Sequence, residues 1–311
     1  MLPGRQLTVL DGAFFAHRSW HARSGRPIEA FVRQITRLIG NEGPDLMAAA
    51  WDAPGPNFRH ELYAAYKANR EEKEPELERH IERCADALRA LGVPVFEAVG
   101  YEGDDVVATL TERWHGGGGV VRVHTADKDL LQLVRPGVTI VLRGEDYGRD
   151  EVVDRWGVPP ELIADLLALA GDAVDGIPGV PGIGALTAAR LLAQWGSVEG
   201  VFEQLHHVTE SRRNALRDHR DAVELYRRLT RLAADAPVPL HAPDLLFIPN
   251  VEEFMAFCRD HDIWPEPLTH HYRERLLVWQ ERLAIMAEAG VHDETARGAA
   301  QHECLQLLPG C

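Results

Sequence analysis

The first half of the chain alternates short apolar segments with amphipathic ones, and this alternation restricts its fold more than any other feature. Buried strands are predicted at 6–12, 45–53, 94–100, 119–129 and 137–144. Helical spacing of apolar residues is found between them, at 27–40, 75–92 and 103–116. Strands that alternate with helices form a mostly parallel sheet with helices on its faces. The sequence therefore predicts an α/β domain.

A helical pattern replaces this alternation from about Pro159. Apolar spacing predicts helices within 159–171, 185–196, 197–205 and 251–263, and a Pro-rich extended stretch over 236–250. From about His271 the tail has amphipathic helical spacing. We therefore expect three parts: an α/β domain over 1–160, a helical domain over 161–270 and a helical tail over 271–311.

Acidic residues gather where the predicted strands end. They come from three strand ends and one helix start, namely Asp11, Asp52, Glu102, Asp104, Asp105, Asp127 and Asp129. Ligands of open α/β sheets bind outside the carboxyl ends of the strands, so we expect these acids at one edge. In an extended segment, the period-two spacing of Asp127 and Asp129 points both carboxylates the same way.

Crowded carboxylates repel one another and raise one another's pKa, so this edge needs a compensating charge. Oxygen ligands without nearby Cys or His suit Mg²⁺ or Mn²⁺. A single acid at a strand end or helix start is more often a structural cap. The prediction of a metal site therefore rests on the convergence of all these segments.

A second acidic pair lies in the stretch 170–192. Asp172 and Asp175 are three residues apart, and Gly179, Gly182 and Gly184 follow them. The glycine order differs from a dinucleotide-binding loop, and no strand precedes it. Glycines that lead into a helix expose backbone N–H groups, which bind phosphate without reading bases. An ordinary helix–hairpin–helix turn with glycines for tight packing explains the stretch equally well.

Cations and aromatic residues recur at three to four residues within 57–74. They are Arg59, Tyr63, Lys67 and Arg70, and Tyr66 lies beside Lys67. On one helical face they would suit the backbone and bases of a single nucleic-acid strand. A solvated charged helix is the competing interpretation, and three glutamates between 71 and 74 favour it.

Charge and cysteine content restrict the class of protein. The formal net charge of −15 argues against a polyanionic partner, although clustered metal-binding acids would account for part of it. Cys84, Cys258, Cys304 and Cys311 have no CxxC spacing, which indicates a reduced, cytoplasmic chain without a zinc site. No apolar run is long enough for a membrane span, and the N-terminus does not have the pattern of a signal peptide.

Five motifs in this order resemble the 5′-nuclease superfamily. They are "LDG" at 10–12, "WDAPGPNFRHELYAAYKANR" at 51–70, "GYEGDDVVA" at 100–108, "TADKDLLQL" at 125–133 and "GDAVDGIPGVPGIGALTAARLL" at 171–192. The chain is most similar to the 5′→3′ exonuclease domain of bacterial DNA polymerase I and its free-standing or phage flap-endonuclease relatives. The combination is far more specific than any single motif.

The resemblance implies a PIN-like α/β catalytic domain with a helical arch, followed by a helix-3-turn-helix DNA-binding domain. It implies hydrolysis of DNA phosphodiester bonds at a 5′ flap, nick or 5′ end in replication and repair. Two or more Mg²⁺ or Mn²⁺ ions would be held by one cluster of Asp11, Asp52, Glu102, Asp104 and Asp105, and by another of Asp127, Asp129, Asp172 and Asp175. Two-metal hydrolysis needs no protein base, which agrees with the absence of a well-placed His in these motifs.

Further expectations follow from the same resemblance. Lys67 and Arg70 match the basic positions that contact the scissile phosphate, and Gly179, Gly182 and Gly184 match a hairpin that holds duplex backbone, often with K⁺. We expect a nucleoid-associated monomer that does not bind membranes. RNA primer strands are a further possible substrate, and a polymerase is a possible partner in trans. No polymerase-like pattern follows residue 195, so we expect a stand-alone nuclease.

Two departures from the family pattern stand out. Val174-Asp175-Gly176 replaces the common "SDN", and Leu186 replaces the Lys of "GEKTA", which would weaken the grip on a duplex. Three other functions fit these motifs less well. A PIN-type ribonuclease would not need the hairpin, a non-catalytic DNA-binding protein would not need the acids, and a haloacid-dehalogenase-like phosphatase would need Asp where Ala13 stands.

Overall fold

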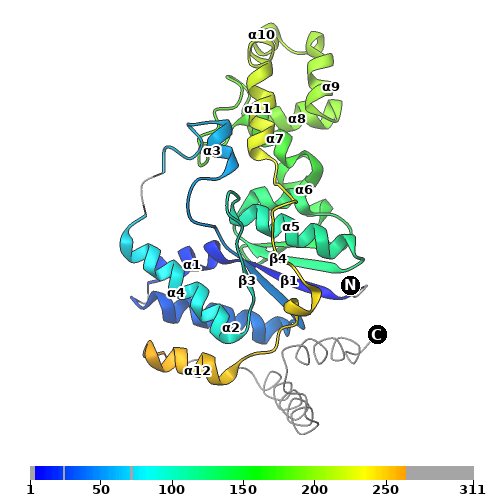
Figure 1. Ribbon diagram of the computed structural model, residues 1–311. Coiled ribbons are helices and arrows are strands. Elements are labelled where there is room, and N and C mark those ends of the chain that lie inside the picture. Colours follow the sequence, from blue (N-terminus) through cyan, green and yellow to red (C-terminus); the bar gives the residue numbers. More distant parts are fainter. Residues whose placement is uncertain (1–3, 24, 71–72, 264–311) are drawn as a thin grey trace.

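A single six-stranded sheet forms the centre of the first domain, with strand order β3-β2-β1-β4-β5-β6 (Figure 1). The computed structural model describes residues 4–23, 25–70 and 73–263. Strands β1 to β5 pair in parallel, and β6 is antiparallel to β5. The strands are β1 (Gln6–Asp11), β2 (Leu46–Ala50), β3 (Val95–Phe96), β4 (Val120–Thr125), β5 (Val138–Leu142) and β6 (Glu145–Tyr147). The mostly parallel α/β sheet is confirmed.

Helices cover both faces of the sheet. They include α1 (Gly12–Trp20), α2 (Pro27–Glu42), α4 (Pro75–Leu91) and α5 (Gly103–Gly116). The short helix α3 (Phe58–Leu62) lies away from the sheet, against α11 (Arg220–Thr230) (Figure 1). Alternate residues of β2 enter two separate cores, with Leu46, Ala48 and Ala50 in the core that includes α5. Met47 and Ala49 enter the core that includes α1, α2 and α4. This period of two places β2 between helices on either side, which explains its uninterrupted apolar sequence.

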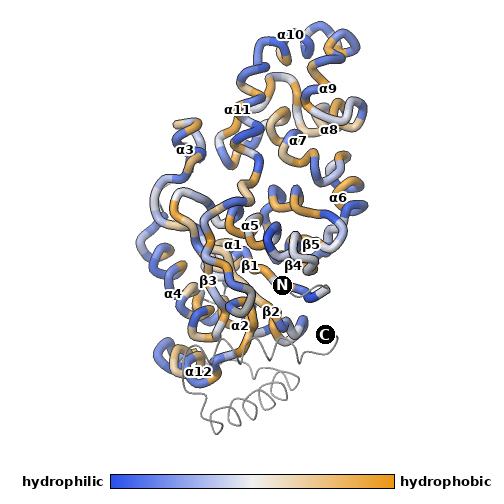
Figure 2. The backbone as a smooth tube through the Cα atoms, turned by 45° about the vertical axis from the view of Figure 1, so that its right-hand side comes forward, coloured by the Kyte–Doolittle hydropathy of each residue, from blue (hydrophilic) through white to orange (hydrophobic). Residues whose placement is uncertain are grey.

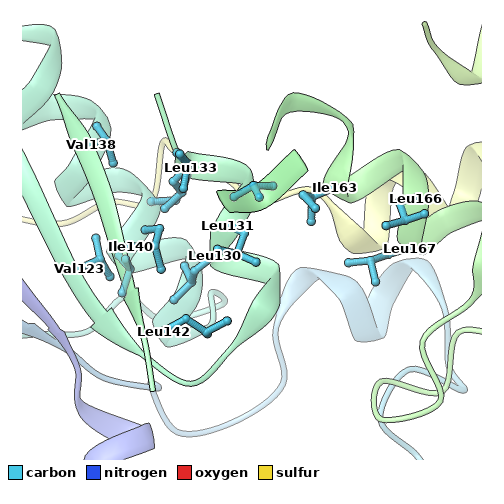
Figure 3. Close-up of a cluster of buried hydrophobic side chains, with 14 of the residues drawn as sticks. Val123, Leu130, Leu131, Leu133, Val138, Ile140, Leu142, Ile163, Leu166 and Leu167 are labelled. Atoms are coloured by element: carbon cyan, nitrogen blue, oxygen red, sulfur yellow. The ribbon is translucent and has the colours of Figure 1, made fainter. Parts of the chain in front are cut away.

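The core on the α5 side continues into a helical second unit. Figure 3 shows Leu130, Leu131 and Leu133 between the sheet residues and Ile163, Leu166 and Leu167. The helices of this region are the 3₁₀ turn η1 (Lys128–Leu133), α6 (Arg149–Trp156), η2 (Pro160–Leu162), α7 (Ile163–Ala170), α8 (Ala185–Trp195), α9 (Val198–Glu203), η3 (Leu205–His207), α10 (Glu210–Asp218) and α11 (Arg220–Thr230). A shared core holds the acids that follow β4, Asp127 and Asp129, in a fixed position relative to the glycine hairpin before α8.

After α11 the chain returns to the first domain. Arg113 of α5 donates hydrogen bonds to the carbonyl oxygens of Val238 at 2.6 Å and Ala236 at 3.2 Å. The chain then forms η4 (Ala242–Leu245) and α12 (Val251–Asp260). Helix α12 lies beside α2 and α4, at the opposite end of the molecule from α10 (Figure 1). Hydrophobic and hydrophilic residues alternate along α12 (Figure 2), and Phe254 and Cys258 enter the core.

Several predicted boundaries are wrong. The strand expected over 94–100 is only Val95–Phe96, and the one expected over 119–129 ends at Thr125. Helix α2 ends at Glu42 instead of Gly40. Within 57–74, only Phe58–Leu62 is helical among the described residues. The tail expected over 271–311 lies outside the described residues. None of the described helices is both long and apolar enough to cross a membrane.

Candidate metal centre

Asp11 and Asp52 lie at the carboxyl ends of the two adjacent central strands. Asp11 ends β1 and caps α1, because its Oδ1 accepts a hydrogen bond from the Phe14 N–H at 3.0 Å. The hydroxyl of Thr125, the last residue of β4, donates to Asp11 Oδ2 at 2.6 Å. Asp52 follows β2 and accepts a hydrogen bond from the Gly103 N–H at 2.7 Å. Asp52 is therefore tied to the start of α5.

Two further acids lie at the start of α5, where the helix dipole favours negative charge. Glu102 precedes the helix and accepts hydrogen bonds from the Tyr66 hydroxyl at 2.8 Å and from Lys67 Nζ at 2.5 Å. Asp104 lies in the first turn and has no hydrogen-bond or ion-pair partner among the described residues. Its pKa is raised well above the ordinary range, by burial and then by Asp127, Asp11 and Asp52.

Asp105 does not face the other acids. Its side chain is fully buried, and both carboxylate oxygens accept hydrogen bonds from the guanidinium of Arg59, at 2.6 and 2.8 Å. Asp105 also accepts the Ala233 N–H at 2.9 Å. The resemblance implies that Asp105 is one of the metal ligands. In this structure, both of its carboxylate oxygens are already occupied inside the protein.

The second group of acids is arranged around a lysine. Lys128 Nζ donates to Asp129 at 2.8 Å and to Asp172 at 2.6 Å. Asp127 and Asp129 are not on an extended segment, because the chain enters η1 and Asp127 Oδ1 accepts the Asp129 N–H at 2.8 Å. The period-two argument for this pair is therefore wrong. Asp175 accepts hydrogen bonds from Arg70 at 2.7 Å and from the Tyr66 hydroxyl at 3.1 Å.

The two groups of acids face two hollows that meet at Asp127. One hollow of about 620 Å³ is bounded by Asp11, Asp52, Glu102, Asp104 and Asp127. The other, of about 1100 Å³, is bounded by Asp127, Asp129, Asp172 and Asp175 and extends to α8. Asp127 lines both, so the acids form one continuous edge and Asp127 joins its two halves.

Burial and mutual repulsion leave several of these acids poorly stabilised as anions. Burial is the largest cause that raises the pKa of Asp11 to about 6 and that of Asp129 to about 7, and Asp127 contributes to both. Burial would also raise the pKa of Glu102, but Lys67 and Arg59 lower it below its ordinary value. The edge therefore carries excess negative charge around Asp11, Asp104 and Asp129.

The excess negative charge can be tested by measuring how the free energy of unfolding depends on pH, with EDTA present to remove metal ions. The pKa of Asp11 is raised in the fold, so its contribution to stability is full below about pH 4 and is lost as the pH rises through about 6. Asp11→Asn can still cap α1 and does not ionise. We expect it to match the wild type in thermal unfolding at pH 4 and to exceed it by on the order of 1–3 kcal/mol at pH 7. A difference that does not change with pH would contradict the charge excess.

The segment 65–70, here called the basic segment, lies over the acids without being a helix. Lys67 has a positive φ of 53°, so Arg59, Tyr63, Lys67 and Arg70 do not share a helical face. Arg59 and Tyr66 are each 2% exposed, which places both in the interior instead of on a DNA-binding surface. Tyr63 packs edge-on against Tyr226 of α11. Lys67, Arg70 and the hydroxyl of Tyr66 contact Glu102 or Asp175. Arg59 also faces acids, but it is buried against Asp105.

The three hairpin glycines have different surroundings. Gly179 has a φ of 68°, and an added Cβ would lie 2.3 Å from the Gly171 nitrogen, so close packing requires glycine there. Gly182 and Gly184 have no heavy atom within 4 Å of an added Cβ, and Gly184 precedes α8. The backbone of these two residues can therefore be approached from outside.

Two sets of residues at the site were missed in the sequence. Phe14, His17 and Trp20 of α1 line the smaller hollow, so a histidine does lie beside the acids. Burial lowers the pKa of His17, with a further contribution from Lys73. Arg143, Arg155 and Arg190 line the larger hollow. The spacing of three between Phe14, His17 and Trp20, shortly after Asp11, was the available signal for the first set. No local signal brings the three arginines together.

The residues present fit divalent cations. Their ligand atoms are all carboxylate oxygens, which Mg²⁺ and Mn²⁺ prefer. Among the described residues, no three His, Cys, Asp or Glu side chains already form a closed metal-binding group. Lys67, Arg70 and Lys128 contact four of the acids, and these cations supply the positive charge in this structure.

Two family models match consecutive parts of the chain. A "5′-3′ exonuclease, N-terminal resolvase-like domain" matches residues 6–157, and a "5′-3′ exonuclease, C-terminal SAM fold" matches residues 158–252. The "5′-3′ exonuclease" of Aquifex aeolicus is 35% identical over 252 residues, which cover 78% of this chain and 86% of that protein. Both the sheet domain and the helical unit are therefore matched.

Other relatives are longer. The DNA polymerase I of Bacillus caldotenax is 35% identical over 259 residues, which cover 78% of this chain and 30% of that protein. The chain thus spans about a third of the length of this relative.

Among solved structures, a bacteriophage T5 5′-exonuclease with zinc ions bound has a TM-score of 0.65 at 22% identity. The match covers 83% of this chain and 98% of that one. A bacteriophage T5 flap endonuclease in complex with DNA and metal ions has a TM-score of 0.64 at 22% identity, with the same coverage. These two likenesses show the fold, and they confirm the helical unit after the sheet.

Proposed function

We propose a substrate and a cofactor for this chain, which belongs to the 5′-3′ exonuclease family and is a phosphodiester hydrolase that acts on DNA. Its substrate is DNA with a 5′ flap, a nick or a free 5′ end, and its cofactors are two divalent cations, Mg²⁺ or Mn²⁺. The observation that carries this proposal is the continuous acidic edge, in which Asp127 lines both hollows.

The acids divide between the two ions. Asp11, Asp52, Asp104 and Asp127 would hold one, and Asp129, Asp172 and Asp175 the other, with Glu102 between the two groups. When bound, the ions lower the pKa of a water molecule and stabilise charge on the transferring phosphate. Asp105 is not in this set, because Arg59 already occupies its oxygens.

Lys67 and Arg70 neutralise the scissile phosphate. Lys67 Nζ lies 2.5 Å from Glu102 and 3.7 Å from Asp175, so it sits between the two groups of acids. Arg70 is half-exposed and pairs with Asp175. When cations take over these acids, both side chains are released toward an incoming phosphate, where their charge stabilises the transition state.

The larger hollow is suited to duplex backbone. Arg143, Arg155 and Arg190 are exposed along it, and their guanidinium groups have no ion-pair partner in the described part of the chain. Gly182 and Gly184 lie at the start of α8, where backbone N–H groups and the helix dipole favour phosphate. The formal net charge of −15 argues against binding of a polyanion, but the charge along this hollow is locally positive, so DNA backbone can bind there. K⁺ at the hairpin belongs to the same proposal.

The smaller hollow is suited to the unpaired 5′ strand. Besides the acids, its lining includes Phe14, His17 and Trp20, which offer flat faces for a base, and the cations Lys67 and Arg70. A strand that crosses from the larger hollow to the smaller one must pass Asp127. Cleavage is therefore expected near the junction of duplex and single strand.

A gel assay separates this function from its alternatives. A 5′-labelled flap DNA and a single-stranded RNA of the same sequence are incubated with Mg²⁺, Mn²⁺ or EDTA. We expect cleavage of the flap near its junction with either metal, and no cleavage in EDTA. Preferential cleavage of the RNA would favour a ribonuclease, and binding without cleavage would favour a non-catalytic DNA-binding protein.

A further inference from the structure

The basic segment (65–70) is docked on a turn that carries two of the acids. This turn, Asp172–Ile177, here called the acidic turn, is closed by paired backbone hydrogen bonds of 2.8 Å between its two end residues. The Lys67 N–H donates to the Asp175 carbonyl oxygen at 3.0 Å. Lys67 is therefore held through its backbone by the same residue whose carboxylate faces its ammonium group.

Gly176 makes this close approach possible. An added Cβ at this position would lie 2.8 Å from the Ala65 carbonyl oxygen and 3.5 Å from the Lys67 nitrogen. Its φ of 70° is also unfavourable for a residue with a side chain. The absence of a side chain thus lets the basic segment lie directly against the acidic turn.

Among the described residues, Asn69 supplies the one side-chain hydrogen bond of this docking that involves no charged group. Its Nδ2 donates to the Ala173 carbonyl oxygen at 2.9 Å, while its Oδ1 lies 3.6 Å from an added Cβ at Gly176. Asn69 is exposed and does not line either hollow. Its amide can therefore hold the segment in place without touching substrate or metal.

We propose that Asn69 is a positioning residue for Lys67. Two contacts hold the basic segment on the acidic turn, one from the Asn69 amide to Ala173 and one from the Lys67 N–H to Asp175. Lys67 has a left-handed backbone conformation, which is unfavourable unless its surroundings fix it. The docking matters most once cations occupy the acids. The ion pairs of Lys67 and Arg70 are then given up, and the two neutral contacts remain to place Lys67 at the phosphate. This inference rests on the proposed role of Lys67.

The test compares single-turnover cleavage of a 5′-flap DNA in Mg²⁺ with DNA binding in Ca²⁺. We expect Asn69→Ala to lower the cleavage rate about threefold to tenfold, the effect of one lost hydrogen bond, without changing the dissociation constant. Asn69→Asp keeps the size but sets an acceptor against the Ala173 carbonyl oxygen, so it should be at least as slow. Asn214→Ala, an exposed asparagine of α10, is the matched control and should cleave at the wild-type rate.

A double variant separates positioning from general loosening. In a Lys67→Ala background, Asn69→Ala should lower the rate by less than about twofold, because its effect passes through Lys67. A full-sized effect in that background would overturn the inference, as would an Asn69→Ala variant that cleaves like Asn214→Ala. If Lys67→Ala alone left the rate unchanged, the proposed role of Lys67 would fail instead.

Discussion

Replacement of Asp104 by Asn is expected to lower turnover on 5′-flap DNA in Mg²⁺ by on the order of a thousandfold. Asp104 is the acid at this edge whose charge is least compensated, since it has no hydrogen-bond or ion-pair partner in the described chain and its pKa is raised by burial and by four neighbouring acids. A bound cation is therefore expected to interact more strongly with the Asp104 carboxylate than with the acids that already have partners. Asn has the same shape but lacks the charge, so metal affinity and transition-state stabilisation fall together.

Two controls make the Asp104→Asn result specific. Binding of the flap DNA in Ca²⁺ should persist, because the arginines and the hairpin are unchanged. Asp86→Asn removes an exposed acid of α4 that forms an ion pair with Arg89, and it should cleave normally. The melting temperature of Asp104→Asn in EDTA should equal or exceed that of the wild type. Near-normal turnover would remove Asp104 from the metal-binding set.

Replacement of Arg59 by Ala is expected to give the largest loss of stability, about 3–5 kcal/mol in the free energy of unfolding. Arg59 is 2% exposed and joins three elements through Asp105 of α5 and the carbonyl oxygens of Leu229 and Arg231 at the end of α11. Its loss leaves the fully buried carboxylate of Asp105 without a countercharge, together with two carbonyl oxygens without their donor.

Arg79→Ala is the matched control for Arg59→Ala. Arg79 pairs with Glu76 on the surface of α4, where both side chains are more than half exposed. Its loss should change the free energy of unfolding by less than about 1 kcal/mol. Urea unfolding of both variants gives the comparison. If the two variants lose equal stability, Arg59 is not the link between the sheet domain and the helical unit.

Functional residues that lie at the ends of strands or at the starts of helices could be predicted from the sequence. Asp11, Asp52 and the acids at the start of α5 follow apolar segments whose pattern is local, so their shared edge could be predicted from alternation alone. The glycine hairpin before α8 could be located in the same way. These residues lie directly beside a strand or helix in the sequence, so their place at the edge of the sheet follows from the position of that strand or helix.

Partners distant in sequence could not be predicted in this way. Arg59 has the spacing of a DNA-binding helical face, but that helix ends at Leu62 and the guanidinium turns inward to Asp105, 46 residues away. Lys128 between Asp129 and Asp172 depends likewise on a contact over 44 residues. The amphipathic helices α10 and α11 were not predicted. A spacing of three to four residues places side chains on one face only if the helix continues through all of them. Where a helix ends depends on how it packs against the rest of the protein.

The most direct test of the two-cation site is the dependence of single-turnover flap cleavage on Mg²⁺ concentration. For two cations that act together, the rate should vanish in EDTA and rise with about the second power of Mg²⁺ concentration before saturation. Asp104→Asn and Asp175→Asn should both shift the curve to higher concentration, because they remove acids from different halves of the edge. Cleavage that persists in EDTA, or the same Mg²⁺ dependence in wild type and both variants, would contradict the assignment of the acidic edge as the metal centre.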